Sequence, residues 1–250
     1  MTKKKAKGES RKNIPGIANP TIAQVLDQFL EAQRHRLKPR TLSPYQDIID
    51  LLKDCLNGYA YNYLDKKESA WLDRLEGEDL EFCDLFGPEK ILPNLDEFLS
   101  YFMVRKVIAG KELLRAAGTV TKQLAKWLAA AGYANEADVE EAMTVGAEAA
   151  DALPRAEELA MRLYGWAESQ GRLEILEQVD SRFTVDRVAP GKIWLSDFLG
   201  RGAYGPIAVP RDISDRCEEG WIITLLLGRS KKGWHIKGWH ILEVGNVYPL

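Results

Sequence analysis

The spacing of apolar residues changes its period once along this chain, near Gly171. Before that point, apolar residues recur every three or four positions, as in the stretch 22–30. After it, apolar and polar residues alternate, as around Phe183 and Val185, and turns such as Pro190-Gly191 separate short apolar runs. The first period is typical of amphipathic helices and the second of half-buried strands. The sequence therefore predicts an α+β protein, with an all-helical bundle followed by a small β-barrel or sandwich, SH3-like or OB-like in size.

Composition and the positions of glycine and proline divide the chain into four parts. We expect a basic disordered tail at 1–17, a helical domain at 18–135, acidic linker helices at 136–171 and a small β domain at 172–250. The linker should hold two helices, because a proline such as Pro154 fits a helix start and breaks a helix interior. No apolar run approaches the roughly 18 residues that span a bilayer. The basic N-terminus is followed by no apolar segment of a secretory signal, so we expect a cytoplasmic location and no membrane contact.

Capping residues predict where the helices of the second part begin. Thr21-x-x-Gln24 forms a capping box for a first helix, and Ser43-x-x-Gln46, with Pro44 at the first helical position, forms one for a second helix. Glycines predict the ends of helices. The expected ranges are from Thr21 into the basic stretch "RHRLKP", from Ser43 to Asn57-Gly58, from Asn94 to near Gly110, and from Gly118-Thr119 to Gly132. An acidic insertion at 58–93 separates the second helix from the third.

Charge is segregated along the chain, although the net charge is only -3. A basic cluster at Arg34, Arg36, Lys38 and Arg40 follows the basic tail, and the outer face of the fourth helix carries Lys122 and Lys126. Acidic stretches lie at 65–97 and 136–177. A polyanion responds to local charge rather than net charge. The alternative is that each charged run is a solvated helix face.

Four segments carry a resemblance to a known family. They are "TIAQVLDQFLEAQ", "RTLSPYQDIIDLLKDCL", "FLSYFMVRK" and "GTVTKQLAKWLAAAGY", in that order. Over about 18–135 the chain resembles the SAM-like, core-binding N-terminal domain of tyrosine recombinases and phage integrases. The resemblance implies a bundle of four or five helices that clamps double-stranded DNA mainly through its backbone, with Arg40, Thr41, Lys122 and Lys126 near phosphates. The 58–93 insertion departs from the family pattern and could cover the DNA face instead.

The catalytic half of a recombinase is missing. In that family, strand exchange needs a tyrosine nucleophile and cationic groups, including a His-x-x-Arg arrangement, that stabilise charge on the phosphate. The residues three places after His35, His235 and His240 are Lys38, Gly238 and Glu243. We therefore expect that the protein has no recombinase activity. We also expect that it is not an enzyme, because the sequence contains no recognisable nucleophile–base pair and no phosphate-binding loop.

Cysteines and histidines predict no metal site and no cofactor. Cys55, Cys83 and Cys217 are far apart and form no Cys-x-x-Cys pair, so we expect buried, reduced thiols. The repeat "KGWHIKGWHI" at 232–241 has two interpretations. One is a Trp–His surface for base stacking or metal. The other, which we favour, is a short duplication that lengthens a strand, because a five-residue offset puts equivalent side chains on opposite faces.

Three classes of function remain open. The first, which we favour, is a non-catalytic DNA-binding protein that contacts phosphates through Arg34, Arg36, Lys38, Arg40, Thr41, Lys122 and Lys126. In it the β domain adds a second contact or binds a protein partner. The second is a protein–protein interaction adaptor with no nucleic-acid role, which an insertion masking the basic face would favour. The third is an enzyme of another type.

Overall fold

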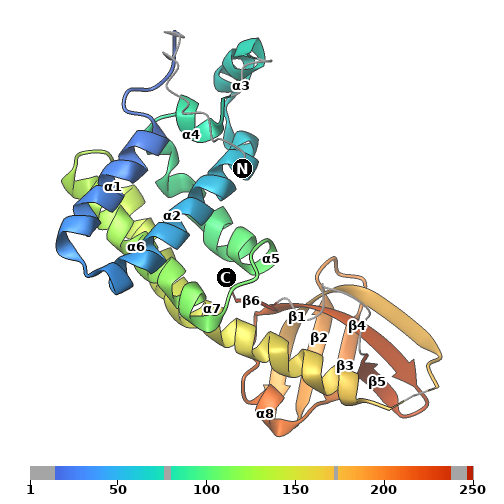
Figure 1. Cartoon of the computed structure of the whole chain (residues 1–250). Coiled ribbons are helices and arrows are strands. Elements are labelled where there is room, and N and C mark those ends of the chain that lie inside the picture. Colours follow the sequence, from blue (N-terminus) through green and yellow to red (C-terminus); the bar gives the residue numbers. More distant parts are fainter. Residues whose placement is uncertain (1–14, 76–79, 172–173, 238–246, 250) are drawn as a thin grey trace, which may run out of the picture.

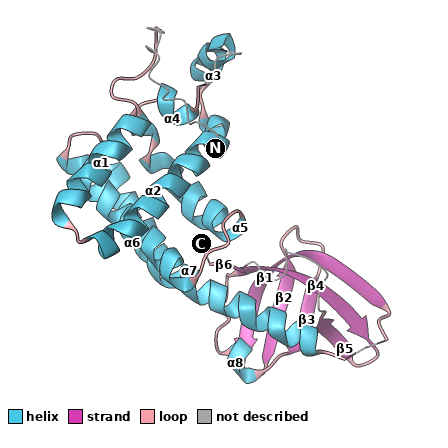
Figure 2. Ribbon diagram, viewed as in Figure 1, coloured by secondary structure: helices cyan, strands magenta, loops and turns pink. Residues whose placement is uncertain are grey.

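The structure is a computed structural model that describes residues 15–75, 80–171, 174–237 and 247–249. Helices make up the N-terminal part, and a curled antiparallel sheet follows at the C-terminal end (Figures 1 and 2). The predicted α+β class is confirmed, with the β part built as a half-barrel. Most of the predicted tail, residues 1–14, lies outside the described residues. At its end, the carbonyl of Pro15 accepts a hydrogen bond from Trp71 Nε1 at 3.2 Å.

The first helix, α1 (Ile22–Arg36), begins where the capping box predicts. Gln24 N donates to Thr21 Oγ1 at 3.4 Å, and Thr21 N donates to Gln24 Oε1 at 2.9 Å. The predicted start of the second helix is wrong, because α2 (Pro39–Tyr59) begins four residues before Ser43. Pro39 and Pro44 suit the first helical position equally well, because each has a fixed φ and lacks an N–H. The helix begins at the earlier one, Pro39. Pro44 therefore lies inside α2, and the carbonyl of Arg40 loses its usual intrahelical donor.

The acidic segment 58–93 is part of the helical core. It contains α3 (Lys66–Leu72), α4 (Phe82–Leu85) and the 3-10 turns Ala60–Tyr63, Asp73–Leu75, Pro88–Lys90 and Leu92–Asn94. Phe82, Leu85 and Ile91 are buried with the apolar faces of α1 and α2. The carbonyls of Leu85 and Phe86 accept hydrogen bonds from Ala18 N and Ile22 N. These contacts fix the segment to the start of α1.

The third predicted helix is present but shorter than expected. The helical turns Glu97–Phe102, with π-type hydrogen bonding, run into α5 (Met103–Arg105), which ends before Gly110. The residues predicted to face inward are buried: Leu95, Phe98, Leu99 and Phe102.

The predicted start of the fourth helix is also wrong, because α6 (Lys111–Ala130) begins seven residues before Gly118. Gly118 lies inside α6 where the helix crosses α7 (Glu136–Ser169). A Cβ built on Gly118 would lie 2.4 Å from both Gly146 O and Ala150 N of α7. The glycine is therefore required for close helix packing and not for a helix boundary.

One continuous helix, α7, replaces the two linker helices that Pro154 led us to expect. Its first half is buried in the helical core, and its second half is buried against the sheet. Figure 2 shows α7 running from the helical part onto the sheet. The residues on its buried stripe are Ala142, Ala149 and Leu153 in the first core and Ala156, Leu159, Leu163 and Ala167 in the second. Burial on both sides of Pro154 outweighs the local cost of a proline in a helix interior.

Glu158 ties the two parts of the molecule together. Its carboxylate accepts hydrogen bonds from Lys111 Nζ (2.8 Å) at the start of α6, from Arg162 (3.1 Å) and from Arg216 (3.1 Å), which follows α8 (Arg211–Ser214) in the β part. Because three cations converge on it, the pKa of Glu158 falls to about 2.

The sheet has the strand order β3-β2-β1-β4-β5, all antiparallel, and β6 pairs with the start of β4. The strands are β1 (Glu177–Ala189), β2 (Lys192–Asp197), β3 (Ala203–Ala208), β4 (Ile222–Ser230), β5 (Gly233–Ile236) and β6 (Val247–Tyr248). The sheet curls until its edges meet, where the rings of Tyr204 on β3 and Trp234 on β5 lie 4.9 Å apart. Its inner face packs on α7.

Candidate nucleic-acid interface

Five of the seven predicted DNA-binding residues lie together at the junction of α1 and α2. We call this segment, residues 34–41, the basic corner. Arg34 and Arg36 are in the last turn of α1, Lys38 is the N-cap of α2, and Arg40 and Thr41 are in its first turn. All five residues are exposed. The early start of α2 therefore places Arg40 and Thr41 on the helix itself, and not on a turn before it.

Lys38 and Arg40 are the cations of the basic corner whose side chains have no partner among the described residues. Arg34 forms an ion pair with Glu31, and Arg36 donates two hydrogen bonds to Gln33 Oε1, at 2.7 and 3.2 Å. Within the described residues, neither Lys38 nor Arg40 has an ion pair or a side-chain hydrogen bond. Two exposed cations, two positions apart in the sequence, are thus available to an external anion.

The N-terminus of α2 adds a favourable field for an anion at the same place. No side chain caps this helix end, and its first turn contains no acidic residue. The N–H groups of Thr41 and Leu42 bond to Lys38 O, whereas no hydrogen bond of the described residues uses Arg40 N–H. Helix N-termini carry partial positive charge and free amides, which favour phosphate groups.

The described residues of the acidic segment 58–93 do not cover the basic corner. It packs on the start of α1, where Ile22 N donates to Phe86 O at 2.8 Å, and on the end of α2, where Cys83 N donates to Asn57 Oδ1 at 2.9 Å. Both contacts lie at the end of the two helices opposite to the corner (Figure 1). Fifteen residues of α1 separate the two ends, which corresponds to about 22 Å at the rise of an α-helix.

The two lysines of α6 are not part of the basic corner. Trp127 turns toward α1, where its ring lies 5.7 Å from the ring of Phe29. At about 100° per residue, Lys126 points about 100° away from Trp127, and Lys122 about 140° away. Lys126 is exposed, but the stem of Lys122 lies on α7, since a Cβ on Gly146 would be 2.9 Å from Lys122 Cγ. Of the two predicted lysines, Lys122 therefore lies against α7, and Lys126 is the exposed one.

The described half of the Trp–His repeat has a structural role. Trp234 packs on Tyr204 at the closure of the sheet, and His235 Nε2 lies 2.8 Å from Ser230 Oγ. Trp239 and His240 lie outside the described residues. Within the described part of the chain, no three His, Cys, Asp or Glu side chains are grouped so that they could hold a metal ion.

The three cysteines are free and buried, as predicted. Burial raises the pKa of each thiol to about 12, so none is a thiolate nucleophile near neutral pH.

Comparison with protein-family models, with curated proteins and with solved structures gave no match for this chain. None of the described helices has the length and apolar character needed to cross a membrane.

Proposed function

We propose that this protein is a non-catalytic DNA-binding protein whose basic corner contacts the phosphate backbone. The observation that carries the proposal is the pair of exposed and unpaired cations, Lys38 and Arg40, at the uncapped N-terminus of α2. The resemblance of 18–135 to integrase core-binding domains points to the same corner. The position of the acidic segment at the far end of α1 and α2 also supports it, because a masked corner would have favoured the adaptor.

The expected mode of binding follows from this chemistry. Arginine and lysine at phosphates position a protein on DNA but read no base, so binding should depend little on sequence. Each neutralised phosphate contributes about 0.9 to the slope of log K against log salt. A corner with two to four contacts therefore gives modest affinity that falls steeply with salt, in the range of non-specific binding, roughly 10⁻⁴–10⁻⁶ M.

The test compares the DNA affinity of two variants, each of which loses one exposed arginine from a different part of the molecule. Arg40 lies at the basic corner, and Arg74 is an exposed arginine of the acidic segment at the other end of the helices. Arg40→Ala should weaken binding similarly for unrelated duplexes and lower the salt slope by roughly one, whereas Arg74→Ala should bind like the wild type. Equal effects of the two substitutions would mean that only overall charge matters. No effect of Arg40→Ala would remove the corner from the interface and favour the adaptor.

A further inference from the structure

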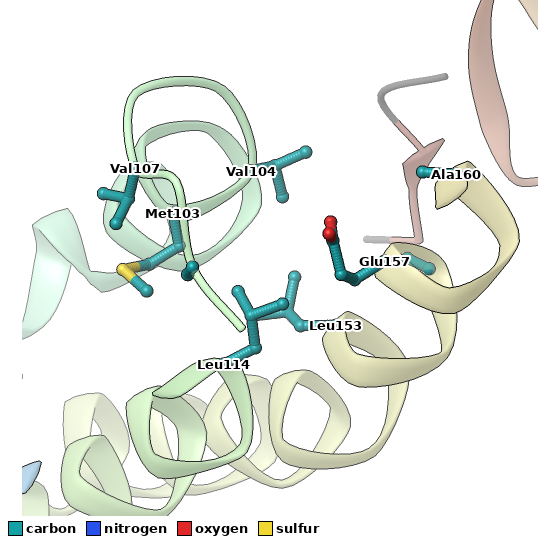
Figure 3. A pocket seen from close by; sticks show the side chains of 9 residues that line it. Met103, Val104, Val107, Leu114, Leu153, Glu157 and Ala160 are labelled. Atoms are coloured by element: carbon teal, nitrogen blue, oxygen red, sulfur yellow. The ribbon is translucent and has the colours of Figure 1, made fainter. Parts of the chain in front are cut away.

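A narrow apolar crevice lies between α5 and the second half of α7, where the helical part meets the β part. Met103, Val104 and Val107 line one side, and Leu114 of α6 and Leu153 of α7 line the base. Figure 3 shows the carboxylate of Glu157 projecting from α7 into this crevice, toward Val104. The crevice has a volume of about 30 Å³. A water-sized group needs about 10–15 Å³, so there is room for an ammonium group and the methylene next to it.

Glu157 has no hydrogen bond or ion pair within the described residues. The cation that acts on its pKa is Lys111, but Lys111 Nζ is bound to Glu158 Oε2 at 2.8 Å. Burial among apolar side chains raises the pKa of Glu157, and Lys111 opposes this only in part. A carboxylate that loses water without gaining a partner costs free energy. A cation placed in the crevice would remove that cost.

Exposed apolar side chains lie beside the crevice lining in sequence and on the Glu157 face of α7. Ile108 is fully exposed and lies between the lining residues Val107 and Ala109. Met161 and Tyr164 are 63% and 47% exposed. Because they lie four and seven positions after Glu157 on α7, they share its face of the helix. Three of the seven large exposed apolar side chains of the described residues therefore adjoin the lining or share the Glu157 face of α7.

We propose that this crevice and its rim are a docking surface for a partner protein that inserts a lysine side chain. The ammonium of that lysine pairs with Glu157, its stem packs on Val104, and apolar neighbours in the partner cover Ile108, Met161 and Tyr164. A desolvated central contact inside an apolar rim is the usual anatomy of a protein interface. The carboxylate disfavours a nucleic acid here, so this surface is separate from the basic corner and does not depend on DNA binding.

Methionine methyl groups provide a direct test in the intact chain. The protein has four methionines; Met103 and Met161 lie at the crevice and its rim, whereas Met143 is on the first half of α7, outside the crevice lining. The protein is labelled with ¹³C at the methionine methyls and titrated with n-butylammonium, which mimics the end of a lysine side chain. Titrations with n-butanol and with sodium butyrate, at equal ionic strength, are the controls.

The proposal predicts saturable shifts of the Met103 and Met161 signals at millimolar n-butylammonium, with Met143 unchanged. Glu157→Gln keeps the shape of the side chain and removes its charge, so it should abolish these shifts while leaving the starting spectrum folded. Absence of saturable shifts in the wild type would overturn the proposal. Equal shifts with n-butanol, or equal shifts in Glu157→Gln, would also overturn it, because either result would show that the carboxylate recognises nothing.

Discussion

Replacing Gly118 with alanine should destabilise the protein, although the same change stabilises most helices. The added Cβ would lie 2.4 Å from Gly146 O and Ala150 N of α7. Ordinary contacts of a Cβ begin near 3.4 Å, so α6 and α7 would have to separate by about 1 Å. Both clashing atoms are backbone atoms inside a helix, and no rotamer change can relieve the overlap.

The magnitude follows from two opposing terms. Alanine in a helix interior is favoured over glycine by about 1 kcal/mol. Overpacking a close contact typically costs about 1–3 kcal/mol, and rigid backbone on both sides puts this site at the upper end. The net expectation is a loss of about 1–2 kcal/mol in the free energy of unfolding. Gly165 of α7 is the matched control, because a Cβ there meets nothing within 4 Å. Gly165→Ala should therefore stabilise by up to about 1 kcal/mol.

The assay is urea denaturation of the wild type and both variants, followed by circular dichroism at 222 nm. The difference between the two variants should be about 1–3 kcal/mol, which is the sum of the two expectations. If Gly118→Ala were as stable as Gly165→Ala, the close crossing of α6 and α7 would be wrong.

Three further predictions concern caps, charge and thiols. Thr21→Ala should lower the free energy of unfolding by about 1 kcal/mol, because it removes the cap of α1. In the same denaturation assay Ser43→Ala should be neutral or slightly stabilising, because Ser43 lies inside α2. Glu158 has a lowered pKa, so its contribution is present above its usual value of 4.5 and is lost as the pH falls toward about 2. Between pH 5 and 3 the wild type should therefore lose more stability than Glu158→Gln; equal losses would contradict this. A thiol reagent at pH 8 should react with no cysteine of the native protein and with all three in denaturant: Cys55, Cys83 and Cys217.

Much of the fold could be predicted because period and capping are local signals. The capping box at Thr21 and the apolar stripe of the third helix are both present in the structure. The start of α2 failed because two prolines give the same local signal, whereas the failures at Gly118 and Pro154 depend on contacts distant in sequence. Gly118 looks like a helix boundary until Gly146 is known to lie against it, and Pro154 looks like a helix break until burial on both sides is known.

The candidate site was predictable in part for the same reason. The basic corner is contiguous in sequence, so its charges could be grouped from the sequence alone. Whether Lys122 faces solvent or α7 depends on the crossing of two helices, which local spacing does not encode. Glu157 went unnoticed among the acidic residues of α7. Its one sequence signal is a carboxylate placed between the buried positions Ala156 and Leu159 and close to the apolar stripe.

The most direct test of DNA binding by the basic corner is fluorescence anisotropy of a labelled duplex across a range of salt concentrations. The intact protein is compared with a chain that starts at Pro15, which keeps the hydrogen bond from Trp71 to the Pro15 carbonyl and removes the basic residues before it. The proposal predicts that the shortened chain still binds and that its affinity falls steeply with salt. Absence of binding at low salt, or binding that disappears with residues 1–14, would contradict a phosphate contact on the folded corner.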